Sequence, residues 1–230
     1  MFIEPEHSSF GSLWAINISR LTARRAMIVP QTLNSFQHVA KVITTGGVIA
    51  FRTDTFYGLG ADPFNASAVQ KIRELKGRED DKPILIVISN TREIDRLIPL
   101  RTKAFDDLAK RFWPGALTII GQATAELPHQ VTAGMKTVGV RLPDDDRVRA
   151  LIAACGGALT ATSANVSGQP AARTAAECES YFGQQIDLIV DGGATTSAAP
   201  STVVDATTAE LKLVREGVIP WSEIRSAISS

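Results

Sequence analysis

Cationic side chains in the stretch "KGREDDK" have the types and spacing of a phosphate-binding cluster. Lys76, Arg78 and Lys82 fall within seven residues, at the end of a segment with helical periodicity. Lysine and arginine neutralise phosphate oxygens, and arginine does so through a planar fork of donors. A solvated helix end, where cations interact favourably with the helix dipole, is the better explanation when this cluster is taken alone.

Five further polar segments follow apolar runs and offer hydroxyl, amide or guanidinium groups. Arg141 is the only charged residue in "TVGVRLP", and Ser163 and Asn165 lie in "TATSANVSGQP". Each has a plain structural explanation, because Arg141 can face solvent on a half-exposed sheet and "SANVSG" can be a simple turn. The five segments are residues 52–63, 137–143, 160–170, 200–205 and 214–217.

The elements that must position these segments alternate between helix and strand. Helical spacing or capping signals occur in 32–47, 65–78, 101–113, 146–157, 175–183 and 221–228. Apolar strand-like runs occur in 48–51, 83–89, 116–123, 137–143, 158–165, 186–193, 201–207 and 211–217. This alternation predicts an α/β fold with a mixed sheet covered by helices. We expect one domain over residues 32–230, preceded by an N-terminal extension or lead-in strand over residues 1–31.

Taken together, the polar segments indicate one ligand site. Polar loops that follow successive strands of an α/β sheet gather at the carboxyl edge, where ligands bind. The basic, hydroxyl, amide and glycine residues of these segments suit a nucleotide.

The composition restricts the class of protein. There are 24 basic and 24 acidic residues, which argues against a general polyanion binder. The two cysteines, Cys155 and Cys178, have no CxxC spacing, so we expect a reduced, cytoplasmic protein without structural zinc. No apolar run approaches the ~20 residues that span a bilayer. The N-terminal residues lack the apolar core of a secretory signal.

Several common chemistries are excluded by their missing motifs. The chain has no Walker A motif, no complete dinucleotide-binding glycine pattern and no G-x-S-x-G turn. Its three histidines are scattered and form neither a metal pair nor a triad. "DDD" at 144–146 is better explained as a helix start than as a cation site. An enzyme with this sequence is expected to work by positioning and charge neutralisation.

Six of these stretches, in order, resemble the YrdC/Sua5 family. They are "TDTFYGLG", "KGRxxxKP", "WPGALT", "TVGVRLP", "TSANVSGQP" and "STVVD", the last followed by "VREG", and they cover roughly residues 32–220. The resemblance implies a twisted α/β sheet around a large, concave, basic cavity. It also implies synthesis of threonylcarbamoyl-AMP and pyrophosphate from L-threonine, bicarbonate and ATP, with Mg²⁺. The product would serve N6-threonylcarbamoyladenosine modification of tRNA through downstream threonylcarbamoyl transferase proteins, and the chain is similar to the short form.

The resemblance also implies roles for individual residues. Threonine contacts are implied for Thr55, Arg141 and Ser201, with Arg141 holding the carboxylate. ATP contacts are implied for Arg78, Lys82, Thr137, Ala161, Ser163, Asn165 and Arg215. Lys76, Arg78 and Lys82 are the implied catalytic cluster, which neutralises the leaving pyrophosphate. No protein metal ligand is implied.

The chain departs from the family pattern at Arg52, Val87, Ala171 and Pro200. Val87 stands where the family often has a histidine near threonine, so we expect weaker rejection of serine. Tyr57 is open to two interpretations, as a wall of the amino acid pocket or as a corner packed on the core. Two other functions remain open: carbamoyl-adenylate formation, and non-catalytic binding of double-stranded RNA or tRNA.

Overall fold

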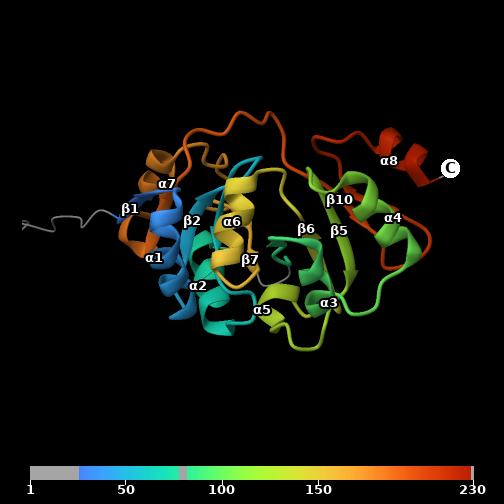
Figure 1. The fold of residues 1–230 in the computed structure, drawn as a ribbon, viewed down its shortest axis with the longest axis horizontal. Coiled ribbons are helices and arrows are strands. Elements are labelled where there is room, and N and C mark those ends of the chain that lie inside the picture. The colour runs from blue at the N-terminus through green and yellow to red at the C-terminus, as the bar shows by residue number, and fades with distance from the viewer. Residues whose placement is uncertain (1–25, 78–81, 229–230) are drawn as a thin grey trace, which may run out of the picture.

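Long-range strand pairing builds the molecule as two mixed β-sheets with helices around them (Figure 1). The computed structural model describes residues 26–77 and 82–228. The predicted α/β class is confirmed, but the strands divide between two sheets where the sequence indicated one. Alternating apolar runs identify strands, whereas the pairing of strands far apart in the chain leaves no local pattern.

The first sheet has five strands and places a late strand between two early ones. Its order is β1 (Ile28–Pro30), β9 (Leu188–Asp191), β2 (Ile49–Arg52), β3 (Tyr57–Gly60) and β8 (Thr162–Ser163). β9 is parallel to both β1 and β2, whereas β2 and β3 form an antiparallel hairpin. β3 lies in a segment that the sequence indicated as loop, so the polar residues 53–56 are the turn of this hairpin.

The second sheet has six strands. Its order is β11 (Lys212–Arg215), β10 (Thr202–Asp205), β5 (Leu117–Gln122), β6 (Thr137–Arg141), β4 (Ile86–Ile88) and β7 (Ala158–Thr160). β10 is parallel to β5 and β4 is parallel to β6, while the other neighbours are antiparallel. Ala161 alone separates β7 in this sheet from β8 in the first, so the two sheets meet there.

Helices cover both sheets. They are α1 (Leu33–Thr44), α2 (Ala66–Lys76), α3 (Ile94–Leu97), α4 (Lys103–Phe112), α5 (His129–Thr132), α6 (Asp146–Ala154), α7 (Ala175–Phe182) and α8 (Trp221–Ile228), with 3₁₀ turns at Thr91–Glu93 and Gly183–Gln185. α1 and α6 pack together over one apolar cluster that contains Phe36, Phe51 and Leu151.

Local capping fixes the ends of the helices that flank the cavity described below. Asp145 is the N-cap of α6, where its carboxylate accepts from the amides of Arg147 and Val148, as expected for a helix start in "DDD". α2 ends at Gly77, whose φ of 55° lies in the left-handed region that glycine adopts without a steric penalty.

The connection from β9 to β10 carries the chain from the first sheet to the second. It passes over the top of the view in Figure 1, in orange, between the α7 side and the β10 side of the molecule. Residues 1–25 lie outside the described residues, so the predicted boundary between residues 31 and 32 stays a prediction. Within the predicted extension over residues 1–31, residues 28–30 form β1 and pair with β9.

Candidate functional site

A cavity of about 470 Å³ lies between the two sheets. The β2–β3 turn, β3 and β8 line it from the first sheet, and β4, β5, β6, β10 and β11 line it from the second. Lys76 at the end of α2 and the loop after β8 complete the wall. The expectation that polar loops after separate strands share one site therefore agrees with the positions of these segments.

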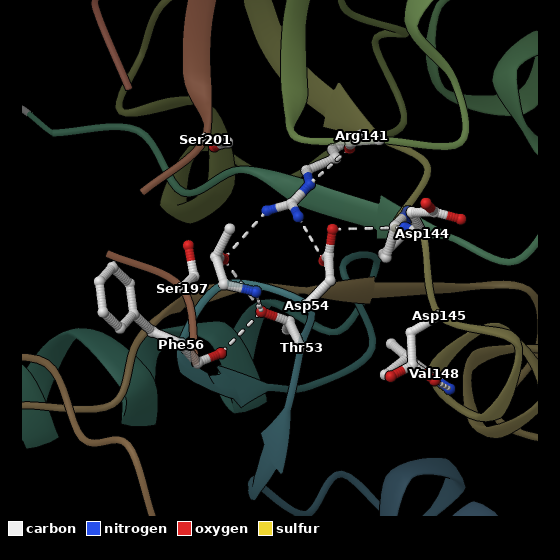
Figure 2. Close-up of polar contacts among 12 residues, drawn as sticks. Thr53, Asp54, Phe56, Arg141, Asp144, Asp145, Val148, Ser197 and Ser201 are labelled. Atoms are coloured by element: carbon white, nitrogen blue, oxygen red, sulfur yellow. Dashed lines mark hydrogen bonds and ion pairs between the residues drawn. The ribbon is translucent and has the colours of Figure 1, made fainter. Parts of the chain in front are cut away.

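Arg141 at the end of β6 is the centre of one end of the cavity. It is 3% exposed, and its guanidinium contacts three groups (Figure 2). Nε donates to the Gly115 carbonyl at 3.0 Å, Nη1 donates to Thr55 Oγ1 at 3.1 Å, and Nη2 forms an ion pair with Asp54. The solvent-facing alternative for Arg141 is thereby excluded.

The guanidinium keeps part of its hydrogen-bonding capacity. It carries five N–H donors, and the three protein contacts use three of them. Burial lowers the pKa of Arg141, and the Asp54 carboxylate opposes this shift, so the side chain stays charged. Arg141 lines the cavity, and a guanidinium with two remaining donors can bind a carboxylate there.

The turn between β2 and β3 holds its shape through its own hydroxyl groups. Thr53 Oγ1 donates to the Phe56 carbonyl at 2.7 Å and lies 3.1 Å from Thr55 Oγ1. Thr55 also receives the hydrogen bond from Arg141, so its hydroxyl is fixed at the cavity wall. Two tethers join this turn to the start of α6, because Arg52 pairs with Asp145 at 2.7 Å and Asp54 accepts from the Asp144 amide at 3.3 Å.

Tyr57 is packed on the core, as one of its two interpretations predicts, because the residue is fully buried. It is also among the residues that line the cavity, whereas its role toward an amino acid stays a prediction. Its hydroxyl donates to the Gly193 carbonyl at 2.9 Å and accepts from the Gly192 amide at 3.2 Å. Burial raises the pKa of Tyr57, so the phenol stays neutral. Its hydrogen bonds with Gly192 and Gly193 anchor the start of the β9–β10 connection.

Ser201 and Arg215 lie together on the second sheet. Arg215 Nη2 donates to the Ser201 carbonyl at 2.9 Å and approaches Ser201 Oγ at 3.3 Å. Ser201 Oγ also lies 2.9 Å from Thr118 Oγ1. The partial burial of the guanidinium lowers the pKa of Arg215, and the charge of Arg141 lowers it further. Two guanidinium groups therefore face the same cavity.

Lys76 does not have the solvated position that its place at a helix end suggested. It is 4% exposed, and its ammonium donates to the carbonyls of Ser163 and Asn165 at 2.5 and 2.9 Å and to Asn165 Oδ1 at 3.0 Å. These contacts fix the loop after β8. The resemblance places Lys76 in the catalytic cluster, and that role stays a prediction, because the hydrogen bonds named here hold the loop while the residue also lines the cavity.

The loop after β8 is closed by a chain of hydrogen bonds. Ser163 Oγ donates to Asn165 Oδ1 at 2.6 Å, and Asn165 Nδ2 donates to the Gln169 carbonyl at 2.5 Å. Asn165 is buried, whereas Ser163 is exposed at the cavity wall. Asn165 therefore shapes the loop, and it lines the cavity together with Ser163, Ser167 and Gly168.

The remaining predicted residues have different positions. Lys82 is exposed and lines the cavity, and Ala161 lines it from the junction between β7 and β8. Arg78 lies outside the described residues. Thr137 is not among the residues that line the cavity; it begins β6, on the face that it shares with Gly139 and Arg141. Its assignment to ATP stays a prediction.

Sequence reasoning missed two residues of the site. Asp54 was not assigned a role, although it pairs with the central arginine. Thr118 was read as part of an apolar strand, yet its hydroxyl is buried against Ser201. A polar residue at an inward position of an otherwise apolar strand is the signal that identifies Thr118.

The described residues show neither a metal-binding cluster nor a membrane-spanning helix. In residues 26–77 and 82–228, no group of three or more His, Cys, Asp or Glu side chains is arranged to bind a metal ion. Over the same ranges, the helices are too short or too polar to cross a bilayer.

The sequence is similar to one family of known proteins over most of its length. The profile of the Sua5/YciO/YrdC family, whose description reads "telomere recombination", matches residues 41–217. Threonylcarbamoyl-AMP synthase of Pyrococcus abyssi is 38% identical over 189 residues, which cover 82% of this chain and 56% of the relative. The threonylcarbamoyl-AMP synthase of Thiobacillus denitrificans is 37% identical over 72% of this chain and 88% of the relative.

A solved structure shares the fold. The crystal structure of P. abyssi Sua5 complexed with L-threonine superposes with a TM-score of 0.83 at 35% identity. The match covers 88% of this chain and 60% of that chain. The chain thus spans little more than half the length of the P. abyssi relative and most of the length of the T. denitrificans one.

Proposed function

The chain belongs to the Sua5/YciO/YrdC family, and from this membership we propose that it forms L-threonylcarbamoyl-AMP and pyrophosphate from L-threonine, bicarbonate and ATP. Relatives with this activity in their names support the proposal, as does the relative solved with L-threonine. The observation that carries it is the buried, oriented guanidinium of Arg141 at one end of a cavity whose other parts offer lysine and hydroxyl groups.

In this proposal L-threonine binds at the end of the cavity around Arg141, which we call the amino acid end. The two remaining donors of Arg141 take the α-carboxylate, while the hydroxyls of Thr55 and Ser201 orient the amino acid. Val87 lies in β4 at the cavity wall and is buried, so it contributes apolar surface toward the methyl group of threonine.

The rest of the cavity binds ATP. Lys82 and Arg78 neutralise the phosphates, and Ser163 together with the backbone of Ala161 contacts the nucleotide. Arg215 lies between the two ends, near both the nucleotide and the amino acid. Thr137 contacts the nucleotide only if ATP extends along β6, and Lys76 and Asn165 support the loop that carries Ser163.

The reaction requires no nucleophile from the protein. The deprotonated amine of threonine forms a C–N bond with the carbon of bicarbonate, and water leaves. A carbamate oxygen then forms a bond with the α-phosphorus, and the bond from that phosphorus to pyrophosphate breaks. The cavity shields the labile carbamate from water and holds it in line with the α-phosphate. The cationic side chains neutralise the charge that develops on the leaving pyrophosphate.

Mg²⁺ takes part in the proposal as a partner of ATP. Because the described residues form no acidic metal cluster, the ion is expected to be held chiefly by phosphate oxygens. It would neutralise charge on the β- and γ-phosphates, next to Lys82.

We place the product in the tRNA N6-threonylcarbamoyladenosine modification, which requires a transferase protein to consume the mixed anhydride. Cys155 and Cys178 are both free thiols, which supports a reducing, cytoplasmic compartment. Within the part of the chain that the structure describes, no observation favours the carbamoyl-adenylate or RNA-binding alternatives.

One assay tests the function. Purified protein is incubated with MgATP, bicarbonate and each amino acid in turn, and pyrophosphate is measured together with the adenylate product by chromatography. Pyrophosphate release that requires both threonine and bicarbonate is expected. Release with carbamoyl phosphate in place of threonine and bicarbonate would indicate the carbamoyl-adenylate reaction instead. Tight RNA binding without turnover would favour the RNA-binding alternative.

A further inference from the structure

The two arginines that face the cavity differ in their counter-ions. Arg141 forms an ion pair with Asp54, whereas no ion pair joins Arg215 to an acidic side chain within residues 26–77 and 82–228. Arg215 instead contacts the neutral oxygen atoms of Ser201. Arg141 therefore has its own counter-ion in the protein, whereas Arg215 keeps its positive charge.

Asp54 neutralises Arg141 from outside the cavity. It does not line the cavity wall, and its side chain is only 16% exposed. Figure 2 shows Asp54 beside the guanidinium of Arg141, where it pairs with Nη2. The other terminal nitrogen, Nη1, donates to Thr55 Oγ1. The Asp144 amide holds the second carboxylate oxygen of Asp54 at 3.3 Å, so the carboxylate is fixed at both oxygens.

This arrangement matters because the proposed reaction brings two kinds of anion into one cavity. Threonine is a zwitterion with no net charge, whereas ATP and pyrophosphate carry several negative charges. An unpaired buried guanidinium attracts any of these anions. A guanidinium already paired with a carboxylate offers an inorganic anion little net attraction, yet its remaining donors still fit a carboxylate.

We propose that Asp54 is a positioning residue that neutralises Arg141 and thereby keeps phosphate and pyrophosphate out of the amino acid end. This proposal rests on the proposed function, in which Arg141 binds the threonine carboxylate. Asp54 acts through Arg141 and not by touching a substrate. Its effect is selectivity between two ligands of the same cavity, not the strength of either site alone.

The test uses Asp54→Asn, which keeps the size and hydrogen-bonding oxygen of the side chain but removes its charge. Adenylate formation is followed at varied threonine concentration in the presence of inorganic phosphate. In the native protein, phosphate should not compete with threonine. In Asp54→Asn it should become competitive, and the ratio of its inhibition constant to the KM of threonine should fall by about tenfold or more. An unchanged ratio overturns the proposal.

Two control variants isolate the role of the charge. Asp144→Asn removes the same charge from a neighbouring side chain that is 72% exposed and makes no contact with Arg141, so it should leave the ratio at the native value. Asp54→Glu keeps the carboxylate and should retain most of the native discrimination. If Asp144→Asn lowers the ratio as much as Asp54→Asn does, the effect is general electrostatics and the specific role of Asp54 is wrong.

Two further measurements keep the proposal separate from folding and from the proposed function. If Asp54→Asn does not fold, the native protein still decides, because competition between phosphate and threonine in the native protein contradicts the proposal. If the native protein shows no threonine-dependent turnover, the proposed function fails. Calorimetric titration of inorganic phosphate into native and Asp54→Asn protein then tests the inference directly, with tighter phosphate binding to the variant expected and equal binding overturning it.

Discussion

The two ends of the cavity are built differently. At the amino acid end, the cation is buried and three protein contacts fix its orientation. At the nucleotide end, the part of the cavity where we propose that ATP binds, Lys82 lines the wall and is exposed. The buried lysine there, Lys76, supports a loop and does not face solvent.

This difference indicates two ways of recognising an anion. A fixed guanidinium recognises a small carboxylate by geometry, so its donors cannot be replaced by a simple positive charge. An exposed lysine recognises a polyphosphate mainly by charge, and the bound ligand supplies most of the order. The following experiments ask whether this distinction holds, from the largest expected effect to the smallest.

Arg141→Lys should produce the largest loss. An ammonium cannot reproduce contacts with Gly115, Thr55, Asp54 and the substrate carboxylate at once, so the change should cost about 2–5 kcal/mol in threonine recognition. Steady-state kinetics should show this as a higher KM for threonine, with the KM for ATP nearly unchanged. Arg101→Lys is the control, since Arg101 also bridges two carboxylates, Asp95 and Asp106, but lies outside the cavity. If Arg141→Lys had the native KM for threonine, the amino acid end would recognise the carboxylate by charge alone, as we propose for the phosphates at the other end.

Lys82→Ala should reduce turnover without unfolding the protein. Losing a charge placed to neutralise the leaving pyrophosphate should lower kcat by about 10²-fold. Because Lys82 is exposed, its loss should hardly change the melting temperature. Lys103→Ala removes a strongly exposed surface lysine and should have neither effect. Normal turnover in Lys82→Ala would restore the solvated-end interpretation of this residue.

Lys76→Met should have the opposite effect to Lys82→Ala, because it should lower the stability of the fold more than the turnover. The change removes the ammonium donor from the carbonyls of Ser163 and Asn165 and from Asn165 Oδ1, which should lower the free energy of unfolding by about 1–3 kcal/mol. Denaturant unfolding measures this loss. Lys71→Met on the exposed face of α2 should be close to neutral. A fully stable Lys76→Met protein with low kcat would instead assign Lys76 to the phosphates.

The native protein should discriminate threonine from serine only modestly. Val87 offers apolar contact but no polar group, and one missing methyl group in an apolar pocket reduces kcat/KM by about 10- to 100-fold. Competition between the two amino acids in the pyrophosphate assay measures the ratio. A preference for threonine of about 10⁴-fold would show that a polar group elsewhere in the pocket recognises the threonine side chain.

Ser163→Ala should give the smallest change. Its hydroxyl already donates to Asn165 Oδ1, and the nucleotide would gain one neutral hydrogen bond from it, worth about 0.5–1.5 kcal/mol. Calorimetric titration should therefore show ATP binding weakened by about tenfold at most. Ser180→Ala on the exposed side of α7 serves as the control. An unchanged dissociation constant would remove Ser163 from the nucleotide contacts.

The sequence carried much of the local structure. Helical spacing placed α1, α4 and α6 close to their observed bounds, and "DDD" indicated the N-cap at Asp145. Such features depend on neighbours three or four residues apart, so they leave a readable pattern. The order of the family motifs also identified the cavity residues, most of which the structure brings together.

The rest depended on contacts that no local pattern encodes. The sequence could not show that Lys76 reaches a loop 87 to 89 residues away or that Asp54 pairs with Arg141 across the two sheets. Lys76 was predicted as part of a cationic cluster and Asp54 was given no role, because the burial of a charge depends on which distant segment covers it. The hairpin of β2 and β3 was hidden for a related reason, since "YGLG" has too few β-branched residues to indicate a strand.

The position of β9 in the first sheet has a consequence for synthesis on the ribosome. β9 ends at Asp191 and inserts between β1 and β2, so neither of these early strands has its shared neighbour until β9 has emerged. The chain must be translated through Asp191 before this sheet can close. During that interval the edge of β2 that later pairs with β9 is open to other chains, and an open edge of this kind favours aggregation of the nascent protein.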